Sequence, residues 1–151
     1  MNIVLFEPEI PQNTGNIVRT CAVTGAKLFL VKPLGFSLAN RFLKRAGLDY
    51  WDEVEINIID DFPKFIQNGG RFFFFSSKAT PLYTEVAYKE DDFLVFGSES
   101  KGLPVEFWEL WPENFYTIPK RETTRCLNLA NAASIVLYEA WRQLEFAAPT
   151  T

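Results

Sequence analysis

Strand-like and helix-like segments alternate along the whole chain of 151 residues, and this alternation restricts the fold more than any other feature. The strand-like segments are short apolar runs at 2–6, 27–31, 53–58, 71–75, 93–96 and 115–118. The helix-like segments between them are 15–24, 37–46, 104–111 and 128–146, with a further short one that Asp60 or Asp61 can cap and that ends at the Gly69-Gly70 pair. Such alternation with short connections predicts an α/β fold, with a mostly parallel sheet covered by helices on both faces.

Several helix boundaries are marked by residues that favour helix ends. Thr14, Ser37 and Asn128 are predicted N-caps, and Gly25 and Gly47 are predicted stops. With 48% hydrophobic residues and no linker, repeat or low-complexity segment, the chain can bury a substantial core. We therefore expect residues 1–151 to form a single domain.

The residue counts exclude several kinds of catalysis. The chain contains no histidine, so histidine-based triads and histidine-ligated metal sites are not available within it. Cys21 and Cys126 form no CxxC pair, and we expect both to be small buried hydrophobic side chains. No metal centre is therefore expected, and any proton transfer has to use carboxylates, Lys, Tyr, Arg or the substrate.

Charge and hydropathy bear on the partners of the protein. The formal net charge is -4, so binding to a nucleic acid would need a local basic patch or a surface shared by two subunits. No run approaches the roughly 18 consecutive apolar residues of a membrane span, and the chain enters a strand without a basic leader. We expect a cytoplasmic protein that does not contact membranes.

The segment IPQNTGNIVRT, residues 10–20, follows the first predicted strand. In parallel sheets ligands bind beyond the carboxyl ends of the strands, so this segment is a candidate site. Pro11 and Gly15 are predicted to shape a turn, Asn13 provides an amide that both donates and accepts, and Arg19 is the single charge. Alternatively, the asparagines only satisfy a tight turn and Arg19 lies on a solvated face.

The segment GSESKGLP, residues 97–104, follows the buried strand at 93–96. Gly97 and Gly102 allow a close approach of the backbone, and Glu99 places a carboxylate between them. The alternative is an ordinary glycine-rich turn before a helix that begins with proline.

The segment IPKRETTRCLNLAN, residues 118–131, joins the last predicted strand to the longest predicted helix. Lys120, Arg121 and Arg125 make it basic in an acidic protein. A second basic group, Arg41, Lys44 and Arg45, lies on one face of a predicted helix. Both groups are candidate RNA contacts, although such groups can equally be solvated surfaces. Tyr50 and Trp51 can stack on a base or pack within the protein.

Taken together and in order, PQNTGNIVRTC, FGSESKGLP and RCLNLANAASIVLYEAWRQ resemble the three motifs of the SPOUT class of RNA methyltransferases. The chain is similar along its length to the small tRNA (cytidine(34)-2'-O)-methyltransferases of the TrmL or YibK family. The stretch FLKRAGLDYWDEV, residues 42–54, is similar to a signature of that family.

This resemblance implies a deep trefoil knot in the C-terminal part, a homodimer, and a bound cofactor, S-adenosyl-L-methionine, which becomes S-adenosyl-L-homocysteine. The implied cofactor contacts are Phe75, Gly97, Ile118, Cys126, Leu127 and Leu129. Cys126 and Ala130 stand where the family often has serines. If a serine hydroxyl matters for cofactor binding, Cys126 is a weaker substitute.

The implied reaction methylates the ribose 2'-hydroxyl of wobble nucleotide 34, a cytidine or modified uridine, in the anticodon stem-loop of tRNA, with leucine tRNA as the expected substrate. The implied catalytic residues are Arg19, Asn13, Glu99 and Tyr138. Arginine has been proposed as the base in related enzymes, but a guanidinium with a pKa above about 12 is a poor base. We therefore expect Arg19 to position the target, Glu99 to orient Arg19 or to cap loop amides, and Tyr138 to reach the site from the dimer partner.

Two alternatives stay open at this point. The same class of enzyme can act on another RNA, for example a ribosomal ribose. A non-catalytic RNA-binding dimer that keeps the knot is the alternative outside the enzymes.

Overall fold

The structure, a computed structural model, describes residues 1–47 and 50–150. It contains a six-stranded sheet of order β3-β2-β1-β5-β4-β6 in which every neighbouring pair is parallel. The strands are β1 (Asn2–Phe6), β2 (Lys27–Val31), β3 (Ile56–Ile59), β4 (Phe72–Phe75), β5 (Phe93–Phe96) and β6 (Phe115–Tyr116). The helices are α1 (Pro11–Thr24), α2 (Arg41–Gly47), α3 (Phe62–Gln67), α4 (Val105–Leu110) and α5 (Leu129–Gln143). Three short 3-10 turns complete the elements, η1 (Trp51–Glu53), η2 (Tyr83–Glu85) and η3 (Pro112–Asn114).

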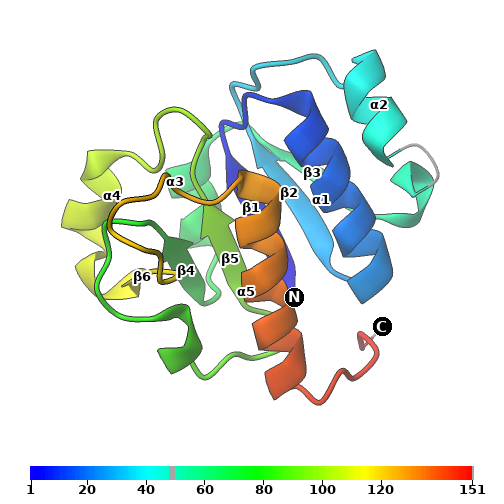
Figure 1. The fold of residues 1–151 in the computed structure, drawn as a ribbon. Helices are drawn as coiled ribbons and strands as arrows, with labels where there is room; N and C mark the ends of the chain where they lie inside the picture. Colours follow the sequence, from blue (N-terminus) through cyan, green and yellow to red (C-terminus); the bar gives the residue numbers. More distant parts are fainter. Residues whose placement is uncertain (48–49, 151) are drawn as a thin grey trace.

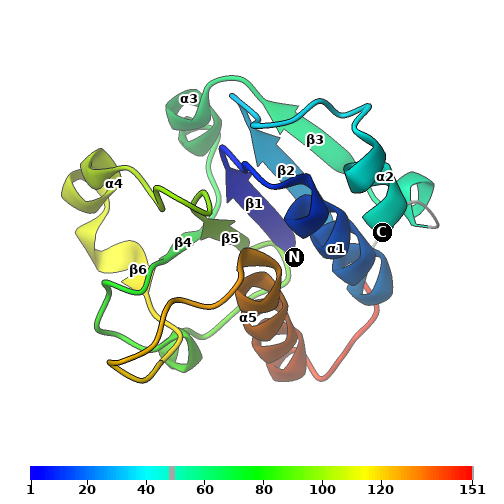
Figure 2. The same ribbon diagram turned by 45° about the horizontal axis from the view of Figure 1, so that its top comes forward.

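Helices cover both faces of the sheet, which confirms the predicted α/β fold. Helices α1 and α5 lie on one face, α3 and α4 lie on the other, and α2 packs beside α1 (Figures 1 and 2). The two cores follow from the alternation of side chains along each strand. Ile3 and Leu5 of β1 belong to the core under α1 and α5, whereas Val4 between them belongs to the core under α3 and α4.

The core under α3 and α4 is mostly aromatic. Phe62 of α3 lies edge-on to Phe6 and Phe74, with ring centroids 5.7 and 6.4 Å apart. It also contacts Phe107 of α4 at 5.3 Å. Edge-to-face and offset aromatic pairs add to the stabilisation from burial alone. This face is thus a packing layer, and the polar segments singled out in the sequence lie elsewhere.

Helix α1 begins at Pro11, four residues before the predicted start, so the prediction of a turn at 11–14 with Thr14 as N-cap was wrong. Proline is suited to the first position of a helix because its missing N–H is not needed there. Gly15 lies inside the helix, and a Cβ at this position would lie 2.4 Å from the Ala46 Cβ of α2. Gly15 therefore allows two helices to pack closely. The predicted stop at Gly25 is confirmed, with a left-handed φ of 81°.

Helix α2, in contrast, starts later than predicted, at Arg41. Asn40 caps it, because its Oδ1 accepts from the N–H groups of Phe42 at 2.8 Å and Leu43 at 3.3 Å. Ser37, the predicted cap, instead accepts from the Ala39 N–H in a separate turn. The predicted Asn128 cap of α5 is confirmed, since its Oδ1 accepts from the Ala130 N–H at 2.8 Å.

Strand β6 is a short edge strand, and the chain beyond it crosses back toward the middle of the sheet. Thr117 pairs with the segment after β4, donating its N–H to the Pro81 carbonyl at 2.8 Å and accepting from the Tyr83 N–H at 2.9 Å. The chain then reaches α5, which lies over the α1 side of the sheet (Figure 2). Whether this return passes through a loop to form the expected trefoil knot stays a prediction. Across the part of the chain that the structure describes, no helix combines the length and the apolar character needed to span a membrane.

Candidate functional site

A cavity of about 480 Å³ opens where the carboxyl ends of β4, β5 and β6 meet. All three segments singled out in the sequence contribute to it: Ile10 and Asn13 from the first, residues 97–103 from the second, and Ile118, Lys120 and residues 126–129 from the third. The position agrees with the expectation for parallel sheets. The strand order brings together segments that are far apart in the sequence.

The second segment supplies the cap that α1 lacks. Ile10, at the N-terminus of α1, has no side chain that can cap it, and the first turn has no acidic residue. The Glu99 carboxylate accepts from the N–H groups of Glu9 at 2.9 Å and Ile10 at 2.7 Å, and from Asn13 Nδ2 at 3.2 Å. A negative charge at a helix N-terminus is favourable because it faces the positive end of the helix dipole. Of the two expected roles for Glu99, the geometry matches the capping of loop amides, and no hydrogen bond to Arg19 is found among the described residues.

Asn13 connects the second segment to the third. Its Nδ2 donates to Glu99, and its Oδ1 accepts from Asn128 Nδ2 at 2.9 Å. Asn13 is buried, and Asn128 also caps α5. A side-chain amide is needed here because one group has to donate in one direction and accept in the other. The chain Glu99, Asn13 and Asn128 thus links all three segments.

A second carboxylate links the same two loops in the opposite direction. Glu9 accepts from the Ser100 N–H at 3.1 Å and from the Ser100 Oγ at 2.6 Å. These hydrogen bonds hold the pKa of Glu9 below its usual value, and the hydroxyl of Ser100 contributes more than its N–H. Neither residue was predicted from the sequence as part of the site. They are 91 positions apart, Glu9 lies outside the three motifs and Ser100 lies inside the second, and the pairing of β1 with β5 brings them together.

All six implied cofactor contacts line the cavity: Phe75, Gly97, Ile118, Cys126, Leu127 and Leu129. Gly97 has no room for a side chain, because a Cβ there would lie 2.3 Å from the carbonyl carbon of Gly102. The N–H groups of Ile118, Cys126 and Leu127 donate to no acceptor in the described part of the protein. The cavity therefore combines apolar side chains with free backbone donors.

The expectation that both cysteines are buried was wrong for Cys126. Cys21 is buried as predicted, and burial raises the pKa of its thiol to about 12. Cys126 is exposed, because the third segment stands away from the sheet between Ile118 and the start of α5. Its side chain lies at the cavity instead of in a core.

Arg19 and Tyr138 lie outside the cavity within this single chain. Arg19 is exposed on α1, and its guanidinium carbon lies 5.4 Å from the centre of the Tyr50 ring. Tyr50 is therefore engaged with Arg19. Tyr138 is 41% exposed on α5 and packs edge-on against Trp141.

The six basic candidates form two separate surfaces. Arg41, Lys44 and Arg45 are exposed on α2, on the side of the molecule that carries α1. Lys120, Arg121 and Arg125 are exposed in the third segment, and Lys120 lines the cavity. Within residues 1–47 and 50–150, no group of three or more acidic, cysteine or histidine side chains is placed so that it could hold a metal ion.

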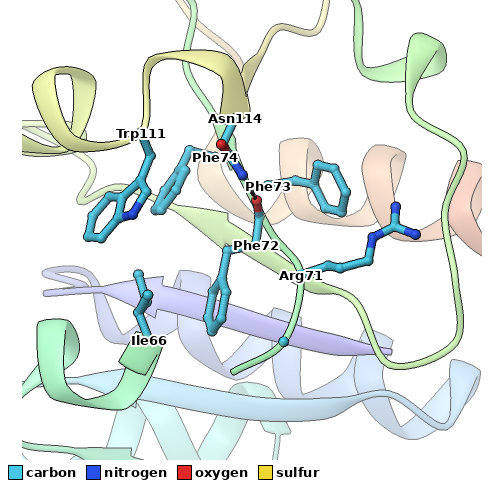
Figure 3. Close-up of a pocket in the computed structure, with 8 residues that line it drawn as sticks. Ile66, Arg71, Phe72, Phe73, Phe74, Trp111 and Asn114 are labelled. Carbon is cyan, nitrogen blue, oxygen red and sulfur yellow. Dashed lines mark hydrogen bonds between the residues drawn. The ribbon is translucent and has the colours of Figure 1, made fainter. Parts of the chain in front are cut away.

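A second hollow of about 440 Å³ lies on the α3 and α4 side, next to the start of β4 (Figure 3). Its walls include Ile66, Phe72, Phe74 and Trp111. Asn114 Nδ2 donates to the Phe72 carbonyl at 2.8 Å. None of the three segments reaches this hollow.

Comparisons with known proteins identify the relatives of this chain. Residues 1–138 match the SpoU rRNA Methylase family. The tRNA (cytidine(34)-2'-O)-methyltransferase of Saccharophagus degradans is 49% identical over 149 residues, which are 97% of either chain. A structure that addresses the 2-OH methylation of C/U34 on tRNA is 43% identical with a TM-score of 0.88, again over 97% of both chains. The AdoMet-bound rRNA methyltransferase of Sinorhizobium meliloti is 28% identical with a TM-score of 0.82, over 95% of this chain and 56% of that one. The chain therefore belongs to the SpoU rRNA methylase family.

Proposed function

We propose that this protein transfers a methyl group from S-adenosyl-L-methionine to the ribose 2'-hydroxyl of nucleotide 34 in tRNA. One observation carries the proposal. The three motif segments converge on one cavity in a chain that is similar over 97% of its length to a tRNA (cytidine(34)-2'-O)-methyltransferase.

The cavity fits the cofactor in size and in chemistry. Small-molecule sites are mostly apolar with a few directed polar groups, and about 480 Å³ lies within their usual range. Phe75, Ile118 and Leu127 provide apolar walls, and the free N–H groups of the third segment can hold adenine and ribose. S-adenosyl-L-methionine carries no phosphate, so its site does not need a glycine-rich phosphate-binding loop. When bound, S-adenosyl-L-methionine supplies an electrophilic methyl group on a sulfonium.

The first segment handles the second substrate, the RNA. Arg19 binds the target nucleotide and bridges its phosphate and its 2'-hydroxyl. Glu99 and Asn13 fix the start of α1, and with it the placement of Arg19 on the same helix. The proton of the 2'-hydroxyl passes late in the reaction to water or to the neighbouring phosphate. Exposed Tyr138 completes the site from a partner subunit.

We further propose a homodimer that forms through α1 and α5. Val23, Ile135 and Tyr138 on these helices are 57%, 37% and 41% exposed, which leaves an apolar surface that a second copy would cover. A dimer also doubles the two basic surfaces of an acidic chain, which favours binding of the anticodon stem-loop. Each subunit works as a single knotted domain in the cytoplasm, with leucine tRNA as its proposed substrate.

The test uses purified protein, isotope-labelled S-adenosyl-L-methionine and tRNA from a strain that lacks the gene. Mass spectrometry of digested tRNA should show a new 2'-O-methyl group at position 34 and none elsewhere. Methylation of a ribosomal fragment instead would establish the other RNA target. Cofactor or RNA binding without transfer to any RNA would support the non-catalytic alternative. Sedimentation equilibrium at assay concentration measures the dimer, and a fully active monomer would contradict that part of the proposal.

A further inference from the structure

We propose that Glu9 is a positioning residue, which holds the second segment in the shape that lines the cofactor cavity. This inference rests on the proposed function, because it assigns the cavity to S-adenosyl-L-methionine. Glu9 itself does not line the cavity, whereas residues 97–103 do. It acts through Ser100.

The contacts form a crossed pair between the two loops. The Glu9 carboxylate accepts from the N–H and the hydroxyl of Ser100, and its two oxygens lie 2.6 and 2.8 Å from the hydroxyl. The Glu99 carboxylate accepts from the N–H of Glu9 in return, at 2.9 Å. We call this arrangement of Glu9, Glu99 and Ser100 the carboxylate clasp. Each loop thus supplies both a carboxylate and a backbone donor to the other.

The hydrogen bonds within the second segment do not include Ser100, because they join only Lys101 and Gly102 to Ser98. The Gly102 N–H donates to the Ser98 carbonyl at 2.9 Å, and the Lys101 N–H donates to the Ser98 hydroxyl at 3.2 Å. Ser100 at the tip is exposed, and within the described residues its donors bond only to Glu9. Without the Glu9 carboxylate, Ser100 would have no side-chain or N–H hydrogen bond to the rest of the described protein, and only Glu99 would still tie the segment to α1.

A carboxylate suits this role better than an amide. Both oxygens of ionised Glu9 accept, so the N–H and the hydroxyl can be satisfied together. A glutamine would present only one accepting oxygen, and its NH₂ group could only donate to the Ser100 hydroxyl oxygen. Hydrogen bonds to an ionised acceptor are also stronger than those to a neutral one.

The C-terminal tail provides a matched control. The Glu90 carboxylate accepts from the N–H and the hydroxyl of Thr150, and these bonds lower its pKa in the same way. This pair has the chemistry of the Glu9 and Ser100 pair, but neither residue lines the cavity. Glu90→Ala therefore measures what the loss of an exposed carboxylate with two donors does by itself.

The experiment compares Glu9→Ala, Glu9→Gln, Ser100→Ala and Glu90→Ala with the unmodified protein by calorimetric titration with S-adenosyl-L-methionine. Glu9→Ala should weaken cofactor binding about tenfold, as expected for losing charge-assisted hydrogen bonds. Glu9→Gln should recover part of the affinity, and Glu90→Ala should bind as the unmodified protein does. Activity at saturating cofactor should change little, so the Michaelis constant for the cofactor rises while kcat is kept.

A second readout does not depend on the cofactor. Hydrogen exchange of residues 98–102 in the ligand-free protein should accelerate in Glu9→Ala and Ser100→Ala, and stay unchanged in Glu90→Ala. Unchanged exchange in Glu9→Ala, or binding within twofold of the unmodified protein, would overturn the inference. If the unmodified protein binds no S-adenosyl-L-methionine but the exchange result holds, the proposed function fails and the clasp stands.

Discussion

The two hollows of this molecule are similar in volume and opposite in chemistry. The cavity at the carboxyl ends of the strands, about 480 Å³, is built by loops that are joined by side-chain hydrogen bonds, and its lining residues Ile118, Cys126 and Leu127 have N–H groups without an acceptor among the described residues. The hollow beside the start of β4, about 440 Å³, is lined mainly by aromatic and aliphatic side chains (Figure 3). Its polar side chains already have partners, since Arg71 pairs with Asp92 at 3.2 Å and Asn114 binds the Phe72 carbonyl.

This difference shows that size alone does not indicate a site. A ligand needs polar groups that the protein has left free and a reason for several segments to converge. The cavity meets both conditions, whereas the aromatic hollow is a gap between packed rings. Substitutions in the two places should therefore have different consequences, which can be ranked by size.

The largest effect is expected for Gly97→Ala. Its Cβ would lie 2.3 Å from the carbonyl carbon of Gly102 and 2.4 Å from the Leu103 nitrogen, so the backbone of the second segment has to move apart. Cofactor binding should fall below detection in a calorimetric titration, while circular dichroism still shows a folded protein. Gly102→Ala is the control, because its Cβ would meet nothing within 4 Å although φ is +67°. It should bind more weakly but measurably, and equal effects of the two variants would contradict the steric argument.

Arg19→Ala separates the cavity from the RNA side. Arg19 lies outside the cavity, so cofactor affinity should be nearly unchanged. Methyl transfer should fall by about 100-fold or more, which is typical of losing one charge-stabilising group. Single-turnover transfer to tRNA measures the loss. Arg19→Lys keeps the charge and loses the planar fork, so little recovery indicates bidentate positioning and large recovery indicates simple electrostatics. If the alanine variant methylates tRNA at the native rate, Arg19 has no role in the reaction and is an ordinary solvated side chain.

Cys126→Ser addresses the cavity lining on a finer scale. Cys126 is exposed at the cavity, and a hydroxyl is a stronger hydrogen-bonding group than a thiol. The serine variant should bind S-adenosyl-L-methionine about threefold more tightly, within the range of one net hydrogen bond. Cys126→Ala is the matched control and should show no gain. Equal affinities for all three proteins would mean that the side chain at 126 does not contact the cofactor.

The smallest effect on activity is expected in the aromatic hollow. Trp111 stacks on Phe74 with ring centroids 5.5 Å apart. Trp111→Leu should lower the free energy of unfolding by about 1 to 3 kcal/mol, because packing is lost. Urea denaturation measures this change. The rate per folded molecule should stay the same. A large fall in rate without a loss of stability would show that this hollow, too, has a function.

The sequence predicted much of this arrangement, and the failures have a common cause. Apolar runs located β1, β2 and β5 to the residue, since strand burial leaves a local pattern. The start of α1 was misplaced, because the residue that caps it, Glu99, is 89 residues from Ile10. A rule based on neighbouring residues cannot identify a cap at that separation. Gly15 was assigned to a turn for the same reason, as the helix that packs against it comes later in the chain.

The residues of the candidate site that were predicted from the sequence are the ones that belong to a recognisable motif. The motif residues Asn13, Glu99 and Asn128 were singled out, and the structure brings them into one hydrogen-bonded chain. The contact between Glu9 and Ser100 was missed, because Glu9 lies outside the motifs, nothing marks Ser100 within its motif, and their contact depends on the strand order. Side chains that only support a site are thus visible in the fold and not in the sequence.

The close contact at Gly15 has a consequence for how a long substrate would be measured. With a Cβ at that position 2.4 Å from Ala46 Cβ and 2.8 Å from the Leu43 carbonyl oxygen, α1 and α2 meet backbone to backbone and leave no room to slide. The close packing therefore fixes the backbone of α2, which carries Arg41, Lys44 and Arg45, relative to that of α1, which carries Arg19. An RNA strand that binds to the basic side chains of α2 would therefore reach Arg19 at a distance set by the packing of the two helices. The nucleotide that is placed at Arg19 would then depend on its distance along the RNA backbone from the nucleotides bound to α2.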